Sequence, residues 1–186
     1  EGSTPLMTLL SDEMLWKYHS QTRLQKLKAL IAEENPENYR YIGTRGPIHD
    51  AVENETPEIL QIILNGMQKF SVDTKNKLLN TPEVILRECD QEKIKLMLTP
   101  LHIAIMQHDF AKIKLLVEAG CDLNTPAIHV NQVTGEEIEM PPILFLYSLA
   151  EIQMIIYLKN VSENGVGADI NPVDGCGDTL FQKKKK

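Results

Sequence analysis

The sequence contains few cysteines and no long apolar run. Its three Cys among 186 residues are too few and too scattered for a zinc site or a disulfide scaffold, which favours a reducing intracellular compartment, cytoplasmic or nuclear. The longest mainly apolar run covers only residues 143–150, whereas a membrane-spanning helix needs about 20 such residues. No signal-like segment is visible. We therefore expect no membrane span.

Patterns that carry chemistry are also missing. His19, His108 and His129 share no ligand spacing, and no His shares a local signature with any Cys, so we expect no metal and no cofactor. The segment GVGAD, residues 165–169, has a Gly-X-Gly but no helix-like pattern after it, and does not predict a phosphate-binding loop. Nothing specifies a reaction, and we expect no catalytic residue and no enzymatic activity.

Basic residues are scarce outside the carboxyl end. The formal net charge is −7. Without the four Lys at 183–186, only 15 of the 19 basic residues remain, compared with 26 acidic residues. Such an acidic body repels nucleic acid, so we expect none as a partner. The Lys run could be a native basic tail or an expression tag, and we assign it no binding role.

The most informative stretch runs from Thr99 to Asn124, TPLHIAIMQHDFAKIKLLVEAGCDLN. Thr can cap a helix whose first residue is Pro, because Pro lacks an N–H and its φ is already helical. Apolar residues then recur at helical spacing in two short segments, and Gly120 lies where a left-handed C-cap is expected. This predicts two antiparallel helices. The residues expected to hold them are Thr99, Pro100, Leu101, Ala104 and Gly120.

This stretch resembles the ankyrin repeat family, whose pattern is T-P-L-H-x-A-A, a second amphipathic helix and x-x-G-A-D-x-N. The resemblance implies that His102, and His49 at the same position of an earlier unit, hydrogen-bond the loop backbone and the motif Thr, which is replaced by Gly46 in the earlier unit. It also implies an all-α solenoid of stacked antiparallel helix pairs with β-hairpin-like finger insertions.

Similar openings begin at Thr4, Gly46 and Pro141, so that successive openings are 42, 53 and 42 residues apart. These intervals exceed the period of about 33 residues, which implies insertions. We expect one domain over 1–182. Its parts are a helical cap or degenerate repeat at 1–42, a repeat with an insertion at 43–98, the best-matching repeat with a hairpin at 99–140, and a degenerate repeat with the start of another at 141–182; residues 183–186 are a basic tail or tag.

The two insertions carry different patterns. In the first, Asn80–Glu83 offers a cap and a Pro in the first turn, which predicts a helix through Cys89, and alternation then predicts an extended arm at 94–98. In the second, residues 127–140 alternate on both sides of a Thr-Gly turn, which predicts a protruding hairpin. Its return arm carries Glu136, Glu137, Ile138 and Glu139, an acidic edge suited to a basic partner surface.

The resemblance also places partner-binding residues on each first helix, just after the A-A pair and facing a concave groove. These are Glu53, Asn54, Met106, Gln107, Ser148 and Leu149. Met106 can anchor a partner side chain, although a Met at helical spacing can equally belong to the core.

We therefore expect a monomeric, non-enzymatic adaptor or scaffold that binds a protein with a basic surface. Insertion-rich repeats also resemble effectors that pathogens deliver into host cells, which would place the chain in host cytoplasm. The alternative function is the targeting region of a larger enzyme whose catalytic domain follows.

Overall fold

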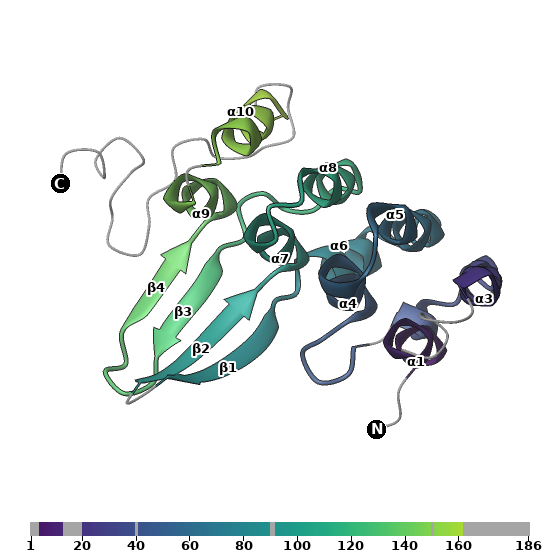
Figure 1. Ribbon diagram of the computed structural model, residues 1–186, viewed down its shortest axis with the longest axis horizontal. Helices are drawn as coiled ribbons and strands as arrows, with labels where there is room; N and C mark the ends of the chain where they lie inside the picture. Colours follow the sequence, from purple (N-terminus) through teal and green to yellow (C-terminus); the bar gives the residue numbers. More distant parts are fainter. Residues whose placement is uncertain (1–3, 13–19, 40, 90–91, 150, 162–186) are drawn as a thin grey trace.

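The computed structural model describes residues 4–12, 20–39, 41–89, 92–149 and 151–161 (Figure 1). Within these ranges, most helices follow one another in pairs. The pairs are α1 (Pro5–Ser11) with α3 (Ser20–Ala32), α4 (Pro47–Asn54) with α5 (Pro57–Gly66), α7 (Pro100–Met106) with α8 (Phe110–Glu118), and α9 (Pro142–Ser148) with α10 (Ile152–Val161). The 165–169 segment, the predicted further repeat after it and the 183–186 tail lie outside the described residues.

The pairs stack along one direction. The first helices contact one another in the order α1, α4, α7, α9, and the second helices α3, α5 and α8 contact one another in the same order. A continuous apolar core runs between the two rows and includes the fully buried Leu6, Ile48, Leu101 and Leu116. Because each pair buries its apolar side against the next, no pair is a separate globule.

Each first helix begins with the same local sequence feature. Its first residue is a Pro, at positions 5, 47, 100 and 142, and the residue before it has an extended backbone in α1, α4 and α7. Pro is well tolerated there because the first N–H of a helix has no intrahelical acceptor. The residues before these prolines are the four openings identified in the sequence.

The expectation of an all-α fold is wrong. The described residues include a four-stranded antiparallel sheet in the order β1-β2-β3-β4. Its strands are β1 (Glu83–Cys89), β2 (Glu92–Leu98), β3 (Ala127–Asn131) and β4 (Glu137–Met140). The two insertions each form a hairpin, and the hairpins join where β2 pairs with β3, from Ile94 opposite Asn131 to Met97 opposite Ile128. An isolated hairpin is marginally stable, whereas four paired strands support one another.

The helix predicted through Cys89 is also wrong, because this segment is strand β1. A helix of the same insertion, α6 (Val72–Asn80), lies upstream, where Ser71 Oγ accepts a hydrogen bond from Thr74 N–H at 3.2 Å. The apolar run from Val84 to Leu86 pairs with the alternating arm 95–97. Pairing with a distant segment and half-burial on a sheet therefore outweigh the local capping signal.

α3 and α5 approach each other closely at Gly66. A Cβ atom there would collide with the Tyr39 hydroxyl and the Ile31 side chain, and Tyr39 is held in place by donating to the Ile63 carbonyl at 2.9 Å. Gly→Ala inside a helix normally stabilises by up to about 1 kcal/mol. We expect Gly66→Ala to destabilise instead, by about 1–3 kcal/mol, because the site is overpacked. Urea unfolding measures this, and an unchanged or raised stability would contradict the close approach.

Candidate protein-binding surface

The best-matching unit is anchored by a buried contact between its motif Thr and His. Thr99 Oγ1 lies 2.7 Å from His102 Nδ1, so the hydroxyl contacts the imidazole and does not cap the backbone of α7. In the preceding unit, where Gly46 stands at the Thr position, the Gly46 N–H donates to His49 Nδ1 at 3.2 Å. Both rings therefore hold the loop that enters their helix, one through a hydroxyl and one through the backbone. Gly120, with φ +90, ends the unit in the left-handed conformation.

Burial controls the ionisation of these groups. It lowers the pKa of both His49 and His102 to about 4, and it raises the pKa of the Cys121 thiol to about 12. Near neutral pH the two rings are uncharged and the thiol keeps its proton. Such groups are suited to packing, not to proton transfer or nucleophilic attack.

Neighbouring units are joined at the carboxyl ends of their first helices. The Lys112 ammonium is buried and donates to the Val52 carbonyl at 2.6 Å and to Gln107 Oε1 at 3.2 Å. Gln107 Nε2 in turn donates to the Glu53 carbonyl at 2.7 Å. A cation at the end of α4 is favourable because the carbonyls there are unpaired within the helix. Gln107, predicted to meet a partner, thus also joins two units.

The predicted first-helix residues lie at the ends of α4, α7 and α9, which are neighbours in the stack. We call this set the helix-end row; it consists of Glu53, Asn54, Met106, Gln107, Ser148 and Leu149. All six are exposed, with Met106 39% and Leu149 37% accessible. The row therefore offers two apolar side chains between polar ones, which is a composition that a protein partner can use.

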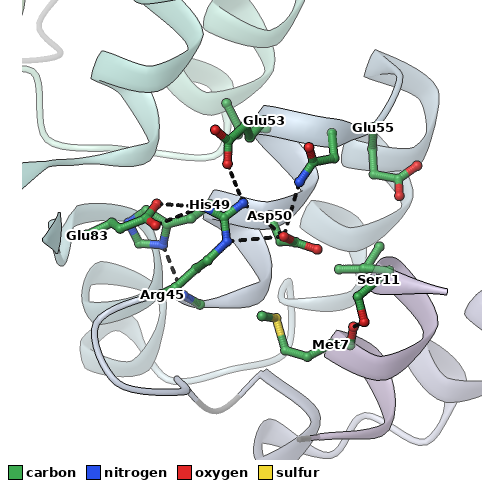
Figure 2. A network of polar contacts seen from close by, with 12 residues as sticks. Met7, Ser11, Arg45, His49, Asp50, Glu53, Glu55 and Glu83 are labelled. Atoms are coloured by element: carbon green, nitrogen blue, oxygen red, sulfur yellow. Dashed lines mark hydrogen bonds and ion pairs between the residues drawn. The ribbon is translucent and has the colours of Figure 1, made fainter. Parts of the chain in front are cut away.

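Arg45, which the sequence analysis missed, joins the row to the sheet (Figure 2). Its Nη1 donates to both oxygens of Glu83 at 2.8 Å, and its Nη2 donates to Asp50 at 2.9 Å and to Glu53 at 2.5 Å. Burial acts to lower the pKa of Arg45, but the bonds to Glu83, Asp50 and Glu53 outweigh it and raise that pKa. Three carboxylates thus surround one guanidinium, and the cluster is net negative.

The sequence contained a signal for one member of this cluster, Asp50. Asp50 occupies the variable position between the His and the first Ala of the motif, the position that Ile103 and Phe145 occupy in the later units. Each lies one helical turn before the helix-end row, so the three share its face. Glu83 carried no such signal, because its contact with Arg45 depends on where β1 begins.

The sheet has two unlike faces. The register places Ile85, Leu96, His129 and Ile138 in one row across the four strands, and it places Val84, Met97, Ile128 and Glu139 in the next row. Facing residues share a face, and successive residues of a strand alternate. Glu83, which meets Arg45, and the buried Leu98 lie on the face of Ile85, which we call the inner face. The opposite one is the outer face.

The predicted binding residues therefore do not form a single surface. Ile138 lies on the inner face with the helix-end row, and Met140 on that face lies 4.0 Å from Ser148 Oγ. Glu137 and Glu139 project from the outer face, and Glu136 lies before β4 begins; all three are exposed. The acidic edge and the helix ends would meet different parts of a partner.

Within the described ranges, no group of three or more His, Cys, Asp or Glu side chains is arranged to hold a metal ion. No helix in that part of the chain combines the length and apolar character required to cross a membrane.

Comparison with known families identifies the third unit. Residues 96–125, which include α7 and α8, match the family model of the ankyrin repeat. This segment is an ankyrin repeat, and the resemblance predicted from the sequence is confirmed. No curated protein matches the chain. An ankyrin repeat indicates a module for interaction between proteins.

Proposed function

We propose that this chain is a non-enzymatic adaptor that binds a protein with a basic surface. Its binding surface consists of the helix-end row, the Arg45 cluster and the inner face of the sheet. We further propose that it acts inside a cell as a monomer, in keeping with its acidic body and few cysteines. An effector role in a host cell remains one form of this proposal.

Apolar and acidic groups lie next to one another on this surface. The helix-end row exposes Met106 and Leu149, and the three carboxylates around Arg45 continue this row to the sheet. Apolar anchors next to an excess of one charge give a partner both contact area and orientation. Buried His49 and His102 hold the helices that present these groups.

Site-specific crosslinking tests the proposal. A photoreactive amino acid placed at Met106 or Leu149 should capture the same protein from cells of the source organism, and mass spectrometry should identify it. The matched control is Lys114, which is exposed on second helix α8. Capture should fall in the Glu53→Lys variant, because reversing this exposed charge repels a basic surface.

The result at Lys114 decides the outcome. If Lys114 captures the same protein as efficiently as Met106 does, the partner does not use the proposed surface. If Glu53→Lys leaves capture at Met106 unchanged, the partner surface is not basic.

A further inference from the structure

The two outer strands of the sheet have unlike edges. β4 is four residues long, carries Glu137 and Glu139, and is followed by Pro141 and Pro142. Short length, charge and proline are the usual means by which a protein protects an edge strand from pairing. β1 is seven residues long and begins Glu-Val-Ile-Leu, with Leu86 67% exposed. β1 also carries charges, at Glu83 and Arg87, but it is longer than β4 and contains no proline.

The direction of the backbone groups on β1 follows from one contact. Val84 N–H donates to the Thr44 hydroxyl at 3.1 Å, so it points away from β2. Because backbone groups of an antiparallel strand alternate in direction, the N–H and C=O of Leu86 point outward as well, and those of Ile85 point to β2. Among the described residues, no strand pairs with this outer edge.

A short turn covers only the base of that edge. Ile42 and Arg45 form a two-residue bridge around Gly43 and Thr44, and this turn contacts β1 at Glu83 and Val84. β1 continues for five residues beyond Val84, and Figure 1 shows the strand extending past the loop that precedes α4. β1 is therefore longer than the 42–45 turn beside it, and its outer edge is uncovered at Leu86.

We propose that the outer edge of β1 receives an extended segment of the protein partner as a fifth strand. Such an added strand is held by main-chain hydrogen bonds, and its alternate side chains determine specificity. On the outer face its side chains would pack beside Leu86 and should be apolar. On the inner face they would approach Asp50, Glu53 and Glu83 near the base and should be basic there.

Arg87 indicates which partner side chain suits the part of β1 near the tip of the sheet. It lies on the inner face, farther from the Arg45 cluster than Ile85 is, so an acidic side chain suits the partner at that level. A segment antiparallel to β1 would therefore alternate apolar and charged residues, with the acidic residue first and the basic residues after it. This inference rests on the proposed function, because it names how the partner reaches the same surface.

A synthetic peptide provides the direct test. The probe is the blocked hexapeptide Val-Glu-Val-Lys-Val-Lys, titrated into the ¹⁵N-labelled chain and followed by NMR. We expect saturable shifts centred on the amide of Leu86. A peptide of the same composition in the order Val-Val-Val-Glu-Lys-Lys should bind at least tenfold more weakly, because it lacks the alternation.

Two substitutions separate backbone pairing from charge attraction. Leu86→Pro removes an outward N–H and leaves the β1–β2 hydrogen bonds in place, since proline is tolerated on an edge strand where its N–H faces solvent. It should weaken probe binding at least tenfold, whereas Leu86→Ala, which keeps the N–H, should weaken it less. Glu53→Gln should weaken binding several-fold, and Glu118→Gln on α8 should not change it.

The outcomes distinguish this inference from the proposed function. If Leu86→Pro and the rearranged peptide leave binding unchanged, the attraction is only electrostatic and the added strand is wrong. If Leu86→Pro also leaves crosslinking at Met106 intact, the partner uses the proposed surface without a fifth strand. The added strand and the proposed function are both supported if Leu86→Pro abolishes probe binding and reduces crosslinking. The NMR spectrum must be unchanged elsewhere, which shows that the fold is intact.

Discussion

Arg23→Met is expected to lower the free energy of unfolding by about 3–5 kcal/mol, which is the usual effect of removing one partner from a buried ion pair. The Arg23 and Glu55 side chains are only 9% and 2% exposed and form a two-point ion pair, in which Nη1 donates to Oε2 at 3.0 Å and Nη2 donates to Oε1. Arg23 also donates to the carbonyls of Leu9 and Leu10, at 3.3 and 3.2 Å. The substitution would leave a buried carboxylate and two helix-end carbonyls without these donors. Urea unfolding measures the loss.

Two variants control this experiment. Arg87→Met changes an exposed arginine on β1 and should alter stability by less than about 0.5 kcal/mol. The double variant Arg23→Met with Glu55→Met should recover much of the lost stability, because it removes the uncompensated charge as well. A loss below about 1 kcal/mol in the single variant would show that the pair does not join α3 to the loop between α4 and α5.

Acidification is expected to destabilise the fold between pH 6.5 and pH 4 through His49 and His102. Burial lowers the pKa of each ring to about 4, against an ordinary value of 6.5. The unfolded chain therefore takes up protons below pH 6.5 while the folded chain does not, so stability falls as pH falls through this window. The loss is about 2 kcal/mol per ring at pH 5. Chemical unfolding from pH 7 to pH 5 measures it.

The chain itself offers the control substitution. Leu144 occupies the position of the motif His in the fourth unit and is buried there, so His102→Leu should fit the equivalent site. The variant loses the contact with Thr99 and is expected to be less stable at pH 7. Its stability should nevertheless fall less between pH 7 and pH 5 than that of the unchanged chain. An equal pH dependence would mean that His102 is accessible to protons in the folded state.

The helix pairs could be anticipated because their signals are local. Pro100, Leu101 and Ala104 lie within two turns of one another, and apolar residues at helical spacing indicate which side is buried. The same reasoning applies to Pro47 and Ala51 in the preceding unit. The family match to residues 96–125 covers the segment where these signals are most complete.

The first insertion shows where such local reasoning fails. Asn80–Glu83 resembles a helix start, yet the chain continues as β1 because Val84, Ile85 and Leu86 pair with Met97, Leu96 and Lys95. The capping signal depends on four consecutive residues, whereas pairing depends on a second segment that the capping pattern does not include. The Arg45 cluster was missed for the same reason, since Glu83 reaches Arg45 only when β1 begins at that residue.

The sequence by itself determined the positions of the four first helices and their buried faces, because proline, small residues and apolar spacing act within a few residues of one another. Only the tertiary structure decided that two separate hairpins would merge through β2 and β3 into one sheet. It also decided that Ile138 and Glu139 would lie on opposite faces, and that β1 would keep an open edge. These features depend on hydrogen bonds between distant segments, whose register no single segment specifies.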